Sequence, residues 1–256
     1  MPSQRVSFPS GDHSLYGIID WPSESDYPDG PRAFGLFAHC FTCTKDLKAI
    51  VRISRALAKS GIAVLRFDFT GLGESGGEFS DSNFDSNQAD IRAAIEWMKS
   101  EHTSPRLLIG HSLGGAAMIG MAQKIPTARA LVTIASPSDT QHLVDVLLRK
   151  NPAIEIEGEG QVEIGGRTYL MRRQLIENLR SHDLKSELEQ MTLPHLIFHS
   201  REDETLGYWH AENMLKHSAG PKALITLPGS DHLLVNQSED VGYVATMIDH
   251  WSSRYL

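Results

Sequence analysis

Short apolar runs alternate with amphipathic segments along most of this chain. Residues 5–22 alternate apolar and polar positions on both sides of Ser10-Gly11-Asp12, which predicts two strands joined by a turn. Short apolar runs predict six further strands, at 33–39, 62–69, 106–110, 128–138, 194–200 and 222–230. Helical patterns occur at 46–61, 86–102, 113–126, 202–219 and 238–256. Strands that alternate with amphipathic helices predict an α/β fold, a mostly parallel sheet flanked by helices.

One long segment interrupts this alternation. Residues 139–191 separate two predicted core strands by far more than one crossover connection needs. Within them, Gly165-Gly166 lies between alternating runs and predicts a hairpin, and 172–191 has a helical pattern. Insertions of this size in α/β folds usually lie over the functional end of the sheet. We therefore expect one domain over residues 1–256, with a small cap insertion at 139–191.

Composition and charge narrow the possible partners. The chain has 256 residues, of which 41% are hydrophobic, and a formal net charge of −8. A mildly acidic protein without a Lys/Arg run has no electrostatic reason to bind nucleic acid or an anionic membrane. The N-terminus has no basic start followed by a long apolar run, so no secretory signal is expected. The prediction is a cytoplasmic protein that binds neither nucleic acid nor membrane.

A G-x-S-x-G motif carries the strongest chemical signal. It consists of Gly110-His111-Ser112-Leu113-Gly114, directly after a predicted strand and at the start of a predicted helix. In this context, a sharp turn exposes the serine hydroxyl above the end of the sheet. The flanking glycines remove Cβ atoms that would collide with neighbouring backbone. Ser112 is therefore the candidate nucleophile.

A serine hydroxyl needs a base, and the base needs an orienting acid. His232 follows the last predicted strand, and the pKa of an ordinary imidazole suits proton transfer near neutral pH. Asp203 follows the preceding core strand, so its carboxylate is expected at the same edge of the sheet. Glu202, Glu204 and Asp231 are the alternatives to Asp203. The predicted catalytic residues are Ser112, Asp203 and His232.

A tetrahedral intermediate also needs two hydrogen-bond donors for its oxyanion. The backbone N–H of Leu113, next to the nucleophile, is expected to be one of them. The second should come from the loop after the strand at 33–39. Within that loop, the N–H of Phe41 is the first choice and that of Cys40 is the second.

With these residues assembled, the chain resembles the α/β-hydrolase superfamily over nearly its whole length. His39-Cys40-Phe41 is similar to the superfamily's His-Gly-x, with Cys40 in place of glycine. The segment 66–75, RFDFTGLGES, resembles the R-x-D-x-x-G-x-G-x-S loop, whose role is mainly structural. The segment 199–203, HSRED, resembles H-G-x-x-D and supports Asp203 as the acid. The resemblance implies the α/β-hydrolase fold with a mostly parallel eight-stranded sheet.

A more specific resemblance involves three longer segments. AHCFTCTKD, RISRALAKSGIAVLRFDFTGLGESGGEF and LIGHSLGGAAM resemble the hydrolase part of bacterial fusion proteins that carry an OsmC-like peroxide-defence domain. The chain ends at Leu256, so that second domain is not expected here. The resemblance implies an esterase-like bacterial protein and establishes no substrate.

Cys40 and Cys43 have C-x-x-C spacing, which leaves three interpretations open. They could be a redox pair, half of a metal site together with His39, or small loop residues beside the oxyanion donors. A structural zinc site needs four ligands, and the sequence has no second cysteine pair. We favour the loop interpretation and expect neither a metal nor another cofactor.

Together these residues predict a serine carboxylesterase that acts on small to medium esters through an acyl-serine. A nucleophilic serine argues against a haloalkane dehalogenase, which uses aspartate at this position, and against a dienelactone-type enzyme, which uses cysteine. Thioesterase, amidase and peptidase activities stay open because one triad serves all of them. A non-catalytic redox or binding module is the alternative from another class.

Overall fold

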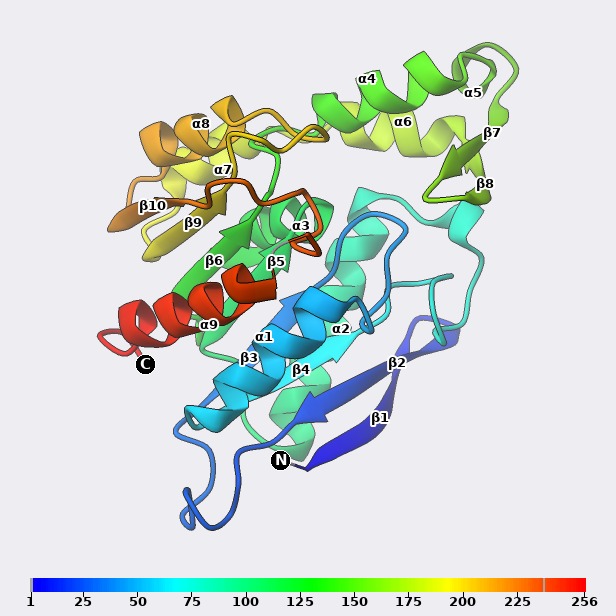
Figure 1. The fold of residues 1–256 in the computed structure, drawn as a ribbon. Helices are drawn as coiled ribbons and strands as arrows, with labels where there is room; N and C mark the ends of the chain where they lie inside the picture. Colours follow the sequence, from blue (N-terminus) through cyan, green and yellow to red (C-terminus); the bar gives the residue numbers. More distant parts are fainter. Residues whose placement is uncertain (1, 237) are drawn as a thin grey trace.

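Eight strands form one sheet in the computed structural model, which describes residues 2–236 and 238–256 (Figure 1). Their order across the sheet is β1-β2-β4-β3-β5-β6-β9-β10, and every pairing from β4 to β10 is parallel. The predicted mostly parallel eight-stranded sheet is therefore confirmed. The strands are β1 (Ser3–Ser10), β2 (His13–Asp20), β3 (Ala33–Ala38), β4 (Ile62–Phe67), β5 (Leu107–His111), β6 (Ala130–Ile134), β9 (His195–His199) and β10 (Lys222–Thr226).

The first two strands form the hairpin that the alternating pattern predicted. Gly11 lies at its turn with φ +58°, a left-handed conformation that glycine adopts without steric cost. β1 pairs antiparallel with β2, and β2 pairs antiparallel with β4. Alternate side chains such as Phe8 and Leu15 are buried, and Phe8 stacks on Trp97 at 5.5 Å between ring centroids. Burial of each such side chain stabilises the fold by roughly 1.5–3 kcal/mol.

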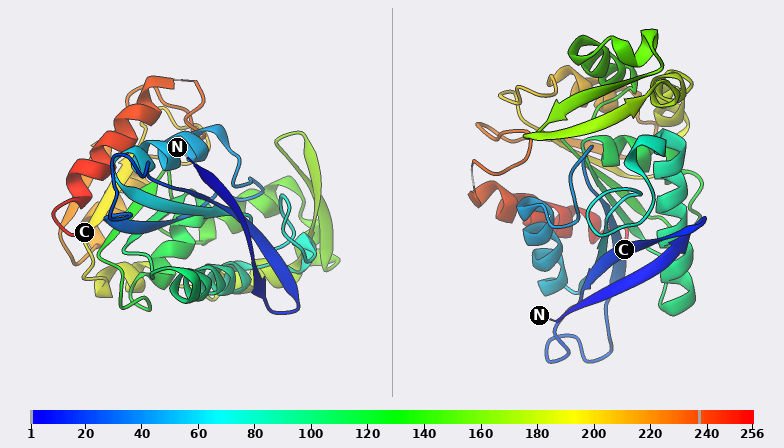
Figure 2. Two further views of the ribbon diagram at one scale, coloured as in Figure 1. Left: turned by 90° about the horizontal axis from the view of Figure 1, so that it is seen from below. Right: turned by 90° about the vertical axis from the view of Figure 1, so that its right-hand side faces the viewer.

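Two layers of helices cover the sheet. Helices α1 (Lys48–Lys59) and α9 (Ser238–Ser252) pack together on one face. The other face carries α2 (Phe84–Glu101), α3 (Leu113–Ala122), α7 (Leu184–Gln190) and α8 (Trp209–His217). The view along the sheet in Figure 2 shows the strands between these two layers. The apolar sides of the helices thus close one core on each face of the sheet.

Several helix boundaries differ from those predicted. α3 ends at Ala122, before Pro126, and α8 begins at Trp209 instead of residue 202. The start of α8 is displaced because residues 202–208 form the loop that presents Asp203, whose carboxylate accepts the backbone N–H groups of Thr205 and Leu206. The helix expected over 172–191 is two helices, because Asp183 caps the start of α7.

Residues 141–180 lie over the carboxyl ends of the strands (Figure 1). They contain three helices and a two-stranded hairpin, which we call the cap. The predicted insertion at 139–191 is longer than this cap, because α7 returns to the sheet and packs beside α3 and α8. The elements of the cap are α4 (Gln141–Lys150), α5 (Ala153–Ile156), β7 (Glu159–Ile164), β8 (Arg167–Arg172) and α6 (Arg173–Arg180).

The longest helix among the described residues is α2, with 18 residues. Asn83 caps its first turn, accepting a bond from the backbone N–H of Ser86, while Phe84 and Ile91 are buried against the sheet. Its opposite side carries charged groups such as Arg92 and is exposed. Within residues 2–236 and 238–256, no helix combines the length and the apolar character needed to cross a bilayer.

Candidate active site

Ser112 lies at a sharp bend between β5 and α3. Its φ of +52° and ψ of −125° are strained for a residue with a side chain, as expected for the serine of this motif. The bend depends on neighbouring glycines. A Cβ on Gly110 would lie 2.4 Å from the Cα of Gly115, and a Cβ on Gly114 would lie 2.3 Å from the carbonyl oxygen of His39. Only glycine lets β5, α3 and the loop after β3 approach this closely.

The structure brings the three predicted catalytic residues together. The Nε2 atom of His232 is 3.0 Å from Ser112 Oγ, and its Nδ1 atom is 2.8 Å from Asp203 Oδ2. The other carboxylate oxygen of Asp203 accepts the backbone N–H groups of Thr205 and Leu206. Burial alone would raise the pKa of Asp203, but the hydrogen bonds from His232 and the two N–H groups outweigh it, so the pKa lies below its ordinary value. The acid is therefore ionised and aimed at the imidazole.

The other nearby carboxylates make different contacts. Glu202 accepts the backbone N–H of Gly229 at 3.0 Å, which joins the two loops that carry the acid and the histidine. Asp231 accepts the backbone N–H of Val235 at 2.7 Å and shapes the loop beyond the histidine. Glu204 is exposed. In the described part of the chain, Asp203 is thus the acid in contact with His232.

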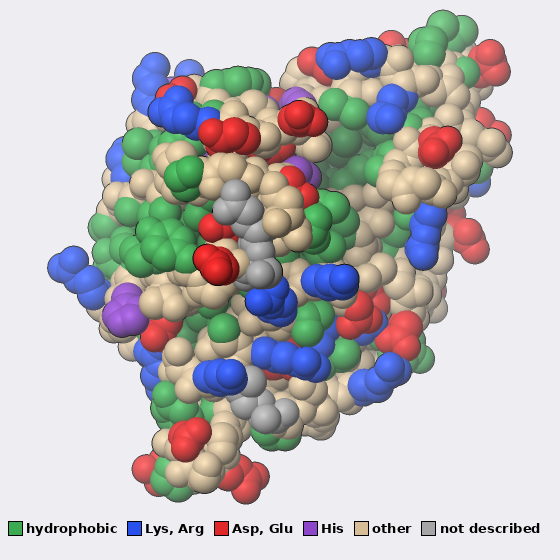
Figure 3. All heavy atoms as spheres, viewed as in Figure 1, with side chains coloured by type: hydrophobic (Ala, Val, Ile, Leu, Met, Phe, Trp, Pro, Cys, Tyr) green, Lys and Arg blue, Asp and Glu red, His purple; other side chains and the backbone are tan. Residues whose placement is uncertain are grey.

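Phe41 and Leu113, the residue that follows Ser112, line one cavity. Among residues 2–236 and 238–256, neither backbone N–H donates a hydrogen bond to another protein group, so both can serve an incoming oxygen. The cavity holds about 340 Å³, including the solvent at its mouth. Apolar side chains from the body and the cap form much of its wall, among them Leu72, Phe79 and Leu175. Figure 3 shows a hollow with hydrophobic side chains beneath the cap, with histidine side chains at its edge.

The loop that carries Phe41, residues 39–47, we call the oxyanion loop. Its first residue, His39, is buried and bonds at both ring nitrogens. Nδ1 donates to the carbonyl of Cys40 at 2.8 Å, which leaves Nε2 to accept the backbone N–H of Phe69 at 3.1 Å. Burial lowers the pKa of His39, so the ring stays neutral and keeps this arrangement. The start of the loop is thereby fixed to the segment after β4.

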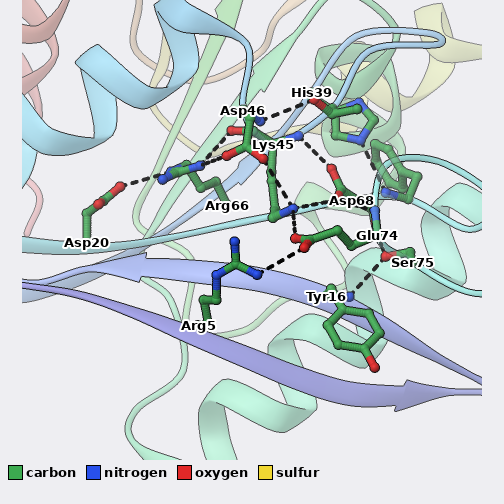
Figure 4. A network of polar contacts seen from close by, with 12 residues as sticks. Arg5, Tyr16, Asp20, His39, Lys45, Asp46, Arg66, Asp68, Glu74 and Ser75 are labelled. Atoms are coloured by element: carbon green, nitrogen blue, oxygen red, sulfur yellow. Dashed lines mark hydrogen bonds and ion pairs between the residues drawn. The ribbon is translucent and has the colours of Figure 1, made fainter.

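A buried ionic network fixes the other end of the oxyanion loop (Figure 4). Lys45 donates to Asp68 through both its backbone N–H and its ammonium group, each at 2.7 Å. Arg66 donates to the carbonyl of Lys45 at 2.8 Å and to Asp20 at 3.0 Å. Burial would lower the pKa of Lys45, but Asp68 and Glu74 raise it above its ordinary value. Arg66, Asp68 and Glu74 lie in the segment 66–75, which therefore supports the loop that approaches Ser112.

His111 has a role that sequence reasoning missed. It is buried, and its Nε2 atom donates to the backbone carbonyl of His232 at 2.8 Å. Burial, reinforced by the nearby His232, lowers the pKa of His111 to about 3, so the ring stays uncharged. The residue before the nucleophile thus holds the backbone of the predicted base. The only sequence signal was a polar side chain at the variable position of the G-x-S-x-G motif.

Loss of the hydrogen bond from His111 to the carbonyl of His232 should slow ester hydrolysis. We expect His111→Leu to lower kcat by about ten- to a hundredfold, because displacement of the His232 loop disturbs its alignment with Ser112. His111→Gln keeps an N–H donor at a similar reach and should retain most of the activity. Steady-state kinetics with a p-nitrophenyl ester would measure both variants. Equal activity of the leucine variant and the wild type would contradict this role.

The two cysteines of the oxyanion loop form a disulfide between Cys40 and Cys43. The favoured interpretation placed both cysteines in the loop as small residues, and the disulfide that joins them keeps the alternative of a redox pair open. Within the described residues, no group of three or more His, Cys, Asp or Glu side chains could hold a metal ion.

Comparisons with known proteins agree with this geometry. Residues 38–156 match a hydrolase family model described as serine aminopeptidase, S33. The esterase domain of a Rhodothermus marinus protein is 37% identical, with 100% of this chain and 99% of that one covered and a TM-score of 0.80. Est1E from Butyrivibrio proteoclasticus, solved with ferulic acid, has the same fold at 20% identity, with 98% of each chain covered and a TM-score of 0.83.

Curated relatives include the palmitoyl-protein thioesterase ABHD10. The rat protein is 26% identical over 213 residues, which cover 79% of this chain and 69% of that protein. The human protein is 25% identical, and the match covers 76% of this chain but only 58% of the human one. The fold, the bend at Ser112 and the full-length match to the Rhodothermus domain lead to one conclusion. The chain belongs to the α/β-hydrolase superfamily, as an enzyme of the serine hydrolase type.

Proposed function

We propose that this protein is a carboxylesterase that cleaves small to medium carboxylic esters through an acyl-serine intermediate. One observation carries the proposal: the hydrogen-bonded chain from Asp203 through His232 to Ser112, beside two N–H groups that have no hydrogen-bond partner among the described residues. The esterase domain that matches this chain along its full length supports the same activity.

The reaction proceeds in two steps. His232 accepts the proton of Ser112 as the Ser112 oxygen attacks the ester carbonyl, and Asp203 stabilises the imidazolium. The N–H groups of Phe41 and Leu113 bind the oxyanion. His232 then protonates the departing alcohol and leaves an acyl-serine. Water activated by the same histidine releases the acid and restores the enzyme.

The walls of the cavity favour short acyl groups. Its volume of about 340 Å³ includes the open solvent at the mouth, so the side chains that line it set the limit on the acyl group. Phe79 and Leu175 limit its length on the side of the cap, and Asn83 and Asn87 add polar groups to its wall. A short aliphatic or compact aryl acyl group fits such a space better than a long lipid chain.

Thioesterase activity is the second candidate. It is favoured by the similarity to ABHD10, a palmitoyl-protein thioesterase, over three quarters of this chain. The same triad and oxyanion donors attack a thioester carbonyl, and only the leaving group differs. The limited cavity again favours short acyl thioesters over a palmitoyl group.

A substrate panel tests both candidates. We expect kcat/KM to be highest for p-nitrophenyl acetate and butyrate and to fall by at least about tenfold for the decanoate, because the longer chain exceeds the cavity. Acetyl and butyryl thioesters of a small thiol, measured by thiol release, give the comparison between leaving groups. Turnover of thioesters alone would replace the first candidate with the second. Failure to turn over any member of the panel would contradict both.

A further inference from the structure

The middle of the oxyanion loop is held by one covalent bond. His39 and Lys45 anchor the two ends of the loop through the buried contacts described above. Between them, the Cys40–Cys43 disulfide encloses Phe41 and Thr42 in a small ring. The ring therefore contains Phe41, which lines the cavity and whose backbone N–H has no hydrogen-bond partner among the described residues.

The backbone inside this ring has an unfavourable conformation. Thr42 has a φ of +59°, in the left-handed region that β-branched residues rarely adopt. A backbone bond from the N–H of Cys43 to the carbonyl of Cys40, 3.2 Å long, closes the same turn. The side chain of Thr42 donates to the carbonyl of Phe41 within the loop, at 2.7 Å. If the disulfide opens, Thr42 can relax toward a favourable φ, and the backbone of Phe41 is no longer held inside a closed ring.

The two cysteines differ in their exposure to solvent, and therefore to a reductant. Cys40 is buried at 3% exposure, whereas Cys43 is half-buried. The sulfur of Cys43 is therefore the side from which an external thiolate can attack. From the cap, Tyr169 donates a 3.3 Å hydrogen bond to the carbonyl of Thr42, so the ring is also in contact with the cap.

We propose that the Cys40–Cys43 disulfide is a redox site for small dithiols, and that its reduction switches the oxyanion hole from an active to a weakly active state. The effect on turnover rests on the proposed hydrolase function, whereas the reducibility of the disulfide does not. A cytoplasmic location, as the sequence predicts, would expose the pair to a reducing pool, where disulfides are usually transient or sensing.

The exchange is balanced. A thiolate of the dithiol attacks the sulfur of Cys43, the S–S bond breaks, and Cys40 leaves as a thiolate that takes up a proton. The second thiolate of the dithiol then attacks the mixed disulfide and releases Cys43, which is also protonated. The dithiol is oxidised to its cyclic disulfide, and the protein gains two electrons and two protons. An oxidised dithiol in excess reverses the sequence.

The first experiment compares oxidised, reduced and reoxidised wild-type protein without denaturant. Dithiothreitol should raise the titre of free thiols from zero to two per chain and lower kcat for p-nitrophenyl acetate at least about tenfold. An oxyanion donor acts mainly in the transition state, so KM should change much less than kcat. Oxidised dithiothreitol should restore both values. Two new thiols with unchanged kcat would overturn the switch, and no new thiols under native conditions would overturn the redox site.

The second experiment separates the switch from general loss of structure. The double variant Cys40→Ser, Cys43→Ser should have the low kcat of the reduced protein and should not respond to dithiothreitol. Far-ultraviolet circular dichroism should match the wild type, because the buried contacts of His39 and Lys45 remain. Wild-type kcat in this variant, or a response to dithiothreitol, would contradict the proposal.

A covalent probe keeps the two proposals distinguishable. A fluorophosphonate that labels Ser112 places its own oxygen in the oxyanion hole, so its labelling rate should fall on reduction even if no ester proves to be a substrate. Labelling that responds to dithiothreitol, without ester turnover, would support the redox site and contradict the carboxylesterase. Ester turnover with a labelling rate that does not change on reduction would support the carboxylesterase and contradict the switch.

Discussion

Replacement of Ser112 with alanine should lower kcat/KM for p-nitrophenyl acetate by about 10⁴- to 10⁶-fold. The hydroxyl is the group that His232 contacts at 3.0 Å, and no acyl-enzyme forms without it. Whatever rate remains comes from binding and from the oxyanion donors acting on water. A fluorophosphonate should label one site in the wild type and none in Ser112→Ala, with the labelled peptide identified by mass spectrometry.

The control for this variant is Ser100→Ala. Ser100 is exposed near the end of α2, where its hydroxyl bonds only to groups of its own helix, the carbonyl of Trp97 and the carboxylate of Glu101. Its removal should leave kcat, KM and labelling at wild-type values. If Ser112→Ala kept even a tenth of the wild-type kcat/KM, a different nucleophile would be required and the proposed mechanism would be wrong.

Acid should unfold this protein steeply because three buried histidines stay neutral in the folded state. Burial lowers the pKa of His195 and that of His210 from the ordinary value of 6.5 to about 3, and the pKa of His111 falls to about 3 for the reason given above. Between these values the unfolded chain binds three protons that the folded protein does not, so stability is lost as the pH falls. Each ring contributes about 1.4 kcal/mol per pH unit, and the three together about 4 kcal/mol per unit between pH 6 and 4. Asp90 opposes this trend, because burial raises its pKa.

Urea unfolding between pH 7.5 and 4.5 measures this slope. The ring of His195 bonds to the hydroxyls of Thr133 and Ser218 at 2.9 and 2.8 Å. His195→Gln should lower the stability at pH 7.5 and also reduce the slope by about 1.4 kcal/mol per pH unit, because glutamine does not titrate. Ser100→Ala, which changes an exposed residue that does not titrate, should keep the wild-type slope. An unchanged slope in His195→Gln would show that this ring is not kept neutral by burial.

The architecture could be predicted because local patterns determine it. Apolar runs of strand length and amphipathic segments located the eight strands and the helices beside them. The meeting of Ser112, Asp203 and His232 followed from one rule, that the carboxyl ends of parallel strands share an edge of the sheet. The start of a helix was harder to predict where a polar side chain binds backbone N–H groups and holds the preceding residues in a loop. The carboxylate of Asp203 accepts the N–H groups of Thr205 and Leu206, and the spacing of apolar residues gives no sign of these bonds.

Contacts between distant side chains and backbone could not be predicted from pattern. The bond from His111 to the carbonyl of His232 joins positions 121 residues apart. A lysine such as Lys45 is usually exposed. Here it is buried, because Asp68 and Glu74 of the segment 66–75 form ion pairs with its ammonium group. The C-x-x-C spacing left a redox pair open without indicating that the two cysteines are bonded to each other. The likeness to the hydrolase part of OsmC-like fusion proteins stays a prediction.

The aromatic contact between the cap and the oxyanion loop bears on enzyme engineering. Phe79 lies with its ring centroid 5.6 Å from that of Phe41 and 5.1 Å from that of Tyr169 on the cap hairpin. A chimaera that exchanged the cap for one from a relative, to alter substrate range, would remove the Tyr169 ring from this stack. The graft would need an aromatic residue at the equivalent place on its hairpin. The cap and the oxyanion loop would therefore have to be exchanged together.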